Sequence, residues 1–475
     1  MNRALEIVLA LVMAGTALAF GGVIPAAYSL MEIVLFAAVL ALLVRDTWRG
    51  QLDLRVSIWP VLFAVWVGLQ LVPLPAGLVR ALEPARFQAP GVPGQPYEAW
   101  LTLSIYPHAT LLGWTRFLAY LAAFVIAIQT FDSRKRSSLL IRALIAIGIF
   151  EAAYGSVQYL TGWEKIFTYT KEYYRGMATG TYINHNHFAG LLELSAPFLV
   201  GSILYSFQMW QANRRKGLSQ TRERGAAPGF QLLVYVFLVI VILVGLIFSR
   251  SRGGILGAII SLLFIALLAQ LRVKRTSWLL GLLGFMAIAG AYGAWIGLGP
   301  VLSRFEALGA GAQNFDVGTR LSFSKDALGM IRDFPWTGIG LGTFVTGVRH
   351  YQTQWTGFFV DHAHNDYVEF AAETGLVGAA LLFLPIVYLL IRMVVSFLDD
   401  SRRYRPAMLL GCIGSTLAIL IHSATDFNLQ IPANALILAV VLGIGYKAAC
   451  VERRDEASGR TSSPQALREV SGRRR

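Results

Sequence analysis

A polar, histidine-containing segment at 361–367 stands directly before a long apolar run and has the residue types that proton transfer needs. His364 is followed by the amide of Asn365, and then by Gly375 and Gly378. A continuous helix of 3.6 residues per turn would place both glycines on the stripe beneath His364. Histidine can take a proton from a hydroxyl near neutral pH, and bare backbone could hold a lipid-linked group. The alternative is a loop histidine beside glycines that allow helices to pack closely.

Two more polar clusters stand where apolar runs begin or end. Asn186 and His187 lie just before one run, and His422 and Asp426 lie at the end of another, four residues apart and so on one helix face. An ionisable pair at the end of a membrane span is a candidate functional pair, although structural pairing is an open alternative. His187 and His364 each end a His-X-His pattern. This pattern lacks the four ligands of a zinc site, so we predict no metal.

Arginines before a later apolar run offer positive charge for an anion. Arg250 and Arg252 precede Gly253 and Gly254, whose backbone N–H groups would be free at a helix N-terminus. A guanidinium next to such a terminus forms a phosphate site. The alternative is that both arginines extend to the membrane surface, as arginines near helix ends usually do. Arg320, at the start of a short amphipathic pattern, is a further candidate for the anion or a solvated charge.

The composition predicts a membrane protein and excludes a soluble enzyme. The 475 residues are 56% hydrophobic and only 14% charged, and apolar runs of about 20 residues recur along the chain. The net charge of +14 does not indicate nucleic-acid binding, because Lys and Arg gather in short loops between apolar runs. Cys412 and Cys450 lie in apolar segments and indicate no disulfide framework.

We predict an all-α polytopic membrane protein with about 12 transmembrane helices. The predicted spans are 4–24, 27–44, 56–74, 112–131, 138–160, 188–209, 231–249, 253–271, 277–297, 371–394, 407–425 and 433–450. They divide the chain into transmembrane regions at 1–297 and 371–450, with a long loop at 298–370 between them. Within this loop, residues 319–332 have the pattern of a short amphipathic helix. Residues 451–475, rich in Ser, Arg and Glu, are expected to form a disordered basic tail.

The distribution of Lys and Arg predicts how the chain is oriented. Basic clusters recur in alternate loops, which places those loops and both termini in the cytoplasm. The long loops 75–111, 161–187 and 298–370 then face the outer side. The N-terminal run resembles a signal peptide, but the many spans that follow favour an uncleaved first helix.

With these pieces in order, the sequence resembles the O-antigen ligase and polymerase superfamily of bacterial membrane glycosyltransferases. The family's ligase signature is His, then Asn, Ser or Gln, nine residues, Gly, two residues, and Gly, Thr or Tyr. His364, Asn365, Gly375 and Gly378 fit it at every fixed position. Further segments that resemble family elements are 251–254, 318–320, 335–340, 182–187 and 422–428. The similarity spans 150–445 in outline.

The resemblance implies an inverting, metal-independent transfer without a cofactor, on the periplasmic side of the bacterial inner membrane. The donor would be a glycan on undecaprenyl pyrophosphate, and the acceptor hydroxyl would belong to lipid A–core or another glycan. In that picture His364 activates the acceptor hydroxyl, while Arg252 and Arg320, with Arg250, hold the pyrophosphate. Asn365, the two signature glycines and the other two polar clusters would support the site.

The acceptor and even the class of protein stay open at this point. The family also includes polysaccharide polymerases and protein O-oligosaccharyltransferases, and the histidine signature favours a ligase among them. A flippase for lipid-linked oligosaccharides would also need many spans and phosphate-binding arginines. Its charged residues should line a cavity near the middle of the membrane. Here they gather at the outer mouths of the spans, which favours an enzyme.

Reporter insertions test the predicted orientation. A reporter placed at 211–229 should read cytoplasmic and one placed at 340–355 periplasmic, because basic loops stay on the cytoplasmic side. Paired alkaline phosphatase and fluorescent-protein fusions at each position provide the measurement. Reversed readings at both positions would put the candidate site in the cytoplasm and contradict the proposed donor.

Overall fold

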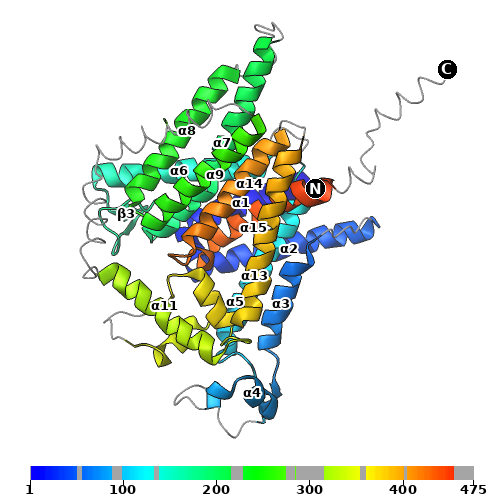
Figure 1. Cartoon of the computed structure of the whole chain (residues 1–475), viewed down its shortest axis with the longest axis vertical. Coiled ribbons are helices and arrows are strands. Elements are labelled where there is room, and N and C mark those ends of the chain that lie inside the picture. The colour runs from blue at the N-terminus through cyan, green and yellow to red at the C-terminus, as the bar shows by residue number, and fades with distance from the viewer. Residues whose placement is uncertain are drawn as a thin grey trace, which may run out of the picture.

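The computed structural model describes residues 2–50, 56–87, 99–132, 138–215, 228–273, 284, 315–353, 360–400 and 404–453. Most of them are helical, so the predicted all-α class is confirmed (Figure 1). The long helices are α1 (Asn2–Leu18), α2 (Pro25–Trp48), α3 (Ile58–Gln70), α5 (Pro107–Thr130), α6 (Leu139–Thr161), α7 (His185–Arg215), α8 (Pro228–Ser249), α9 (Arg252–Val273), α13 (Asp366–Asp399), α14 (Tyr404–His422) and α15 (Pro432–Tyr446). The other elements are α4 (Ala76–Leu82), α11 (Phe315–Asp333), α12 (Phe344–Gly347), the strand pairs β1–β2 (Leu74–Pro75, Trp100–Leu101) and β3–β4 (Lys165–Ile166, Tyr169–Thr170), the 3-10 helices η1 (Phe20–Gly22), η2 (Pro84–Phe87), η3 (Val348–His350) and η4 (Asn428–Gln430), and the π-helix η5 (Lys447–Val451).

Nine helices in this described part of the chain are long and apolar enough to cross a membrane, and each overlaps a predicted span. The predicted span at 4–24 is divided between α1 and η1, because Gly21 takes a left-handed conformation with φ of 70°. The predicted span at 56–74 contains only the 13 residues of α3. The predicted span at 277–297 lies outside the described residues.

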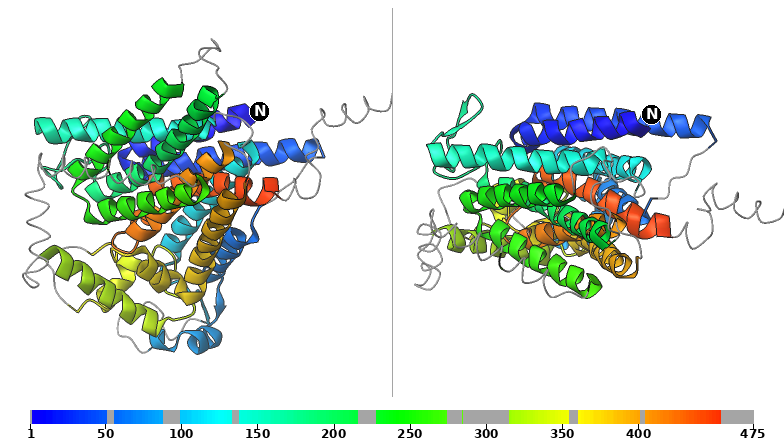
Figure 2. Two further views of the ribbon diagram at one scale, coloured as in Figure 1. Left: turned by 45° about the horizontal axis from the view of Figure 1, so that its top comes forward. Right: turned by 90° about the horizontal axis from the view of Figure 1, so that it is seen from above.

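Two buried helices, α7 and α14, form the centre of the bundle. They pack closely because small residues stand at their crossing: a Cβ on Gly201 would lie 2.0 Å from the Ala407 carbonyl oxygen, and one on Gly411 would lie 2.3 Å from the Phe198 ring. Such close backbone approach is how membrane helices gain packing contact. α1 and α2 lie side by side at one edge of the bundle, with α6 next to α1 (Figure 2). The central pair therefore provides a rigid support for the loops at its ends.

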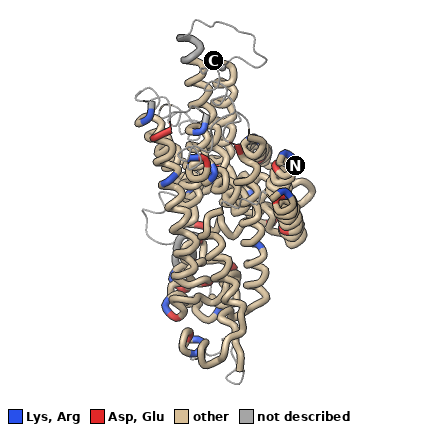
Figure 3. The backbone as a smooth tube through the Cα atoms, turned by 90° about the vertical axis from the view of Figure 1, so that its right-hand side faces the viewer, with Lys and Arg blue, Asp and Glu red and all other residues tan. Residues whose placement is uncertain are grey.

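Basic side chains hold one end of the bundle together. Arg272 of α9 donates to the carbonyl oxygens of Phe397 and Asp400, and Arg405 pairs with the Asp400 carboxylate. The other side of Arg405 lies 3.6 Å from Glu452. Long stretches of the helices between the two ends carry neither acidic nor basic residues (Figure 3). The end of α9, the start of α14 and the end of η5 thus meet at one pole of the bundle. The sequence predicts this, because it places the basic loops on the same side of the membrane.

The histidine segments lie at the opposite pole, together with α11 and α4 (Figure 1). α11 contains the predicted amphipathic helix at 319–332, and Phe323, Ala327 and Met330 point into a small separate core. That core also contains Phe344 of α12 and Ala363 of the histidine segment. It fixes the loop that carries His364 against α11.

α13 is broken at Gly375, whose φ of 69° and ψ of 173° are essentially restricted to glycine. The break opens the helix backbone to the 335–340 segment. Ile339 N–H donates to the Ala372 carbonyl oxygen at 3.0 Å. A Cβ on Gly375 would lie 2.1 Å from the Trp336 carbonyl oxygen. The signature glycine therefore allows a loop to dock on α13.

This geometry corrects one expectation about the glycine stripe. The backbone of Trp336 and Thr337 covers Gly375, and a Cβ on Gly378 would lie 2.9 Å from the ring of Trp66 in α3. α13 begins only at Asp366 and is interrupted at Gly375. The expected helical stripe beneath His364 is therefore wrong. Other segments of the protein cover the glycine backbone that was expected to face a lipid-linked group.

Replacing Gly375 with alanine should destabilise the fold. The backbone conformation alone costs a non-glycine residue about 1–3 kcal/mol, and the overlap with the Trp336 carbonyl adds to this. A fall in the unfolding temperature of the detergent-solubilised protein is the expected measurement. Gly15→Ala is the matched control, because a Cβ there meets nothing within 4 Å. Equal stability of the two variants would show that the break in α13 is not needed.

Candidate functional site

The buried carboxylate of Asp426 joins three polar segments that are distant in sequence. Asn186 Nδ2 donates to its Oδ2 at 2.5 Å. His187 Nε2 lies 3.4 Å and His364 Nδ1 lies 3.9 Å from its Oδ1. The Phe427 N–H caps the same Oδ1 at 2.8 Å. The structure therefore brings together residues of α7, the histidine segment and the loop after α14, which the sequence suggested only as separate clusters.

The ring of Phe427 gathers three histidines around the same point. His362 stacks on it with ring centroids 4.0 Å apart, while His187 and His364 meet it edge-on at 4.6 Å and 4.9 Å. The face of His364 is also near Phe323 of α11, with centroids 6.2 Å apart. Aromatic packing thus fixes the ring of His364 from two elements.

The backbone around His364 is shaped by the start of α13. His364 itself has a φ of 51°, a left-handed conformation that histidine adopts more readily than most non-glycine residues. Asn365 is the N-cap of α13: its Oδ1 accepts from the Val368 N–H at 3.2 Å. Its Nδ2 donates to the Ala424 carbonyl oxygen at 3.1 Å. Asn365 therefore ends the loop, begins the helix and ties both to the Asp426 loop.

His362 forms the tightest ion pair of the histidine segment. Its Nδ1 lies 2.7 Å from Glu369 Oε1, and Glu369 Oε2 accepts from the Ala363 N–H at 2.8 Å. Desolvation opposes the charged ring, but the Glu369 carboxylate outweighs it and raises the pKa of His362 to about 9. The sequence analysis did not predict this pair. The signal was present, since Glu369 stands one turn into the helix that follows the loop.

A second buried pair stands behind the site, at the start of α9. His422 Nδ1 lies 2.8 Å from Glu193 Oε1, and His422 Nε2 lies 3.5 Å from Ser251 Oγ. A Cβ on Gly253 would lie 2.6 Å from the His422 ring. His422 and Asp426 were predicted as a pair with each other; the structure shows a side-chain ion pair of His422 with Glu193 and a backbone hydrogen bond from the Asp426 N–H to the His422 carbonyl oxygen at 3.1 Å. Nothing in the sequence marked Glu193, because it stands alone in the apolar run of α7.

The three candidate arginines occupy different positions. Arg252 is the first residue of α9, directly beside the His422 contact. Arg250 Nη2 donates to Tyr159 Oη at 3.3 Å, with its guanidinium 5.5 Å from the centre of that ring. Residue 320 lies in the first half of α11, one turn before Phe323, and its side chain is outside the described part of the structure. Among the three, Arg252 is thus the arginine with a described side chain that stands at the N-terminus of a helix next to the site.

The histidines are held by protein groups. His185 Nδ1 lies 2.7 Å from the Ser249 carbonyl oxygen, and His187 and His362 contact carboxylates as described above. Among the residues that the structure describes, no three His, Cys, Asp or Glu side chains are grouped so that they could hold a metal ion. Metal independence itself stays a prediction.

Comparison with known protein families supports the resemblance found in the sequence. Residues 237–383 match the family model described as O-antigen ligase. This match supports the resemblance to the O-antigen ligase and polymerase superfamily. No curated protein sequence matches the chain. The O-antigen ligase match contains His364 and the three arginines, whereas Asn186, His187, His422 and Asp426 lie outside it and reach the site only through the fold.

The His362–Glu369 pair should make stability fall at alkaline pH. The pKa of His362 is raised from 6.5 to about 9 in the fold. Its contribution is therefore complete below pH 6.5 and is lost as the pH rises through 9. Unfolding temperatures measured between pH 6 and pH 10 should decline over this window. Glu369→Gln should flatten that decline, and an unchanged pH profile in this variant would contradict the ion pair.

Proposed function

We propose that this member of the O-antigen ligase superfamily transfers a glycan from undecaprenyl pyrophosphate to an acceptor hydroxyl at the periplasmic face of the bacterial inner membrane. The observation that carries the proposal is His364 with Nδ1 facing Asp426, beside the start of α9 that bears Arg252. A base and a phosphate-binding terminus then stand at one pole of a membrane-spanning bundle. This is the arrangement that transfer from a lipid-linked pyrophosphate requires.

His364 would act as the general base. With Nδ1 turned to Asp426, Nε2 is the ring nitrogen that can accept the proton of the acceptor hydroxyl. The acceptor oxygen attacks the anomeric carbon, the bond from that carbon to the pyrophosphate oxygen breaks, and the configuration inverts. The proton moves to His364, and the Asp426 carboxylate stabilises the imidazolium that forms. Removal of a general base typically costs about 10²–10⁴-fold in rate.

The departing pyrophosphate needs positive charge, and Arg252 is the strongest candidate to supply it. It combines a guanidinium with the N-terminus of α9, where the Gly254 N–H donates to Ser251 Oγ at 3.1 Å. Arg320 stands one turn before the α11 residue that contacts the His364 ring, so it is retained as a second pyrophosphate ligand. Arg250, which donates to Tyr159, is a supporting one. In this proposal fixed arginines take the place of a divalent cation.

The acceptor distinguishes the members of this superfamily, and the proposal here is a ligase that uses lipid A–core. The histidine signature favours the ligase over a polysaccharide polymerase or a protein O-oligosaccharyltransferase. A flippase is the candidate from another class. Against it, His364, Asp426 and Arg252 all stand at helix ends at one pole, whereas a transported substrate needs a site near the middle of the membrane.

Purified protein with a lipid-linked glycan donor and lipid A–core acceptor provides the test. Wild type should form the product without an ion gradient and in the presence of EDTA. His364→Ala should lose roughly 10²–10⁴-fold in rate. Its unfolding temperature is measured alongside, because the ring packs on Phe427 and Phe323 and a loss of folding must be separated from the loss of the base. Product formation is followed by gel mobility of the acceptor lipid.

His350→Ala is the matched control, since His350 is exposed in the same outer region and makes no contact with the site. It should retain wild-type activity. An active His364→Ala variant would remove His364 as the base. Activity that EDTA abolishes and one divalent cation restores would show that the arginines alone do not neutralise the leaving group.

A further inference from the structure

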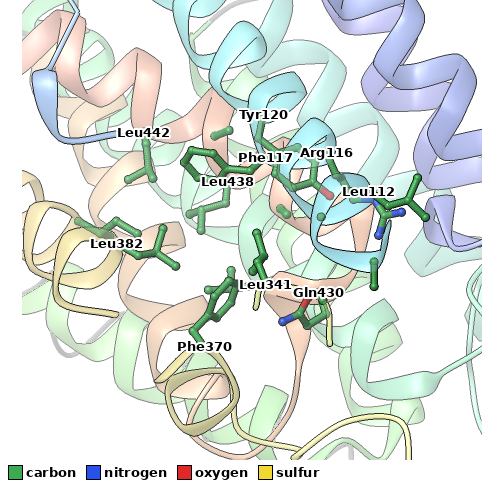
Figure 4. Close-up of a pocket in the computed structure, with 17 residues that line it drawn as sticks. Leu112, Arg116, Phe117, Tyr120, Leu341, Phe370, Leu382, Gln430, Leu438 and Leu442 are labelled. Atoms are coloured by element: carbon green, nitrogen blue, oxygen red, sulfur yellow. The ribbon is translucent and has the colours of Figure 1, made fainter. Parts of the chain in front are cut away.

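A cavity of about 310 Å³ lies between α5, α13 and α15, next to the candidate site. Its walls are mainly apolar, with Phe117 on α5, Phe370 and Leu382 on α13, and Leu438 and Leu442 on α15 (Figure 4). All three helices are membrane-length and apolar. The residues of the proposed transfer chemistry do not line this cavity. Its contents must therefore suit a hydrocarbon environment.

Three hydrogen-bond donors interrupt this apolar wall. Arg116 Nε, Tyr120 Oη and Gln430 Nε2 are buried and have no hydrogen-bond partner among the described residues. Arg116 Nε lies 3.6 Å from Glu32 Oε1, and its guanidinium sits 4.1 Å from the centre of the Tyr28 ring. Buried donors without partners are costly and rare in folded proteins, so Tyr120 and Gln430 each call for an acceptor, while Arg116 adds the positive charge of an ion pair with Glu32.

The donors occupy more than one depth along the cavity. Gln430 belongs to η4, in the loop that follows Asp426 and precedes α15. Arg116 and Tyr120 lie further along, at about 14 and 20 Å from the start of α5. In Figure 4, Arg116 and Gln430 stand on one side of the cavity, and Leu382, Leu442 and Phe370 on the other. A ligand that fits must place acceptor oxygens at different depths along one side of the cavity and hydrocarbon along the other side.

We propose that this cavity binds a glycerophospholipid of the surrounding membrane. One acyl chain would fill the apolar side, and the ester and phosphate oxygens would accept from Gln430, Arg116 and Tyr120. A prenyl phosphate fits less well, because its acceptor oxygens are confined to one end. The volume is at the lower limit for small-molecule sites, which suits one chain and not a whole lipid. This proposal concerns lipid binding and does not depend on the transfer reaction.

Lipid retained by the purified protein tests the proposal. Wild type, washed extensively in mild detergent, should keep a stoichiometric phospholipid that mass spectrometry of the extract quantifies. Ala439→Phe, which fills the cavity, should lose it. Gln430→Leu keeps the size of the side chain but removes a donor, and should weaken binding about twofold to tenfold. Ala37→Phe, at an exposed position of α2, is the control and should retain as much lipid as wild type.

Two results would overturn the proposal. One is equal phospholipid retention in wild type and Gln430→Leu, which decides the matter even where Ala439→Phe does not fold. The other comes from adding lipids back to the stripped protein and following the unfolding temperature. Phosphatidylglycerol should raise it for wild type and much less for Gln430→Leu. A larger rise with undecaprenyl phosphate than with phosphatidylglycerol would show that the cavity takes a prenyl lipid.

Discussion

One buried negative charge, the carboxylate of Asp426, is the constraint around which the pole with the candidate site is built. A carboxylate removed from water is costly unless hydrogen bonds and positive charge surround it. Asn186 and the Phe427 N–H donate hydrogen bonds to it, and the rings of His187 and His364 face it from separate parts of the chain. The need to satisfy one charge thus brings the candidate base to a defined position.

The signature glycines serve this arrangement indirectly. The left-handed break at Gly375 lets the 335–340 segment pair with the backbone of α13, and Gly378 lets α3 approach through Trp66. Both contacts fix the first turns of α13, and with them the N-cap Asn365 and the loop that presents His364. The spacing of the two signature glycines suggested a ligand groove in the sequence. In the fold, both glycines instead make packing contacts that hold the loop with His364.

Local patterns predicted much of the fold, because apolar length and basic loops are properties of single segments. Nine spans and α11 follow from them. The break in α13 could not be predicted, since it depends on the 335–340 segment, which docks on Gly375 from far upstream in the chain. Within the site, His364 and Arg252 were evident from their neighbours. Glu193 was not, because only its contact with His422 across two helices gives it a role. The spacing of residues in the sequence does not indicate such contacts between distant helices.

The boundary of the family match has a consequence for domain exchange. The matched segment, 237–383, contains the candidate base and the candidate arginines, but the carboxylate and the aromatic ring next to His364 come from 426–427, and His187 comes from α7. The matched segment is therefore not a transplantable module. A chimera that takes this segment from a relative would also need the corresponding stretches at 184–193 and 422–430, because the inherited histidine would otherwise face a foreign partner.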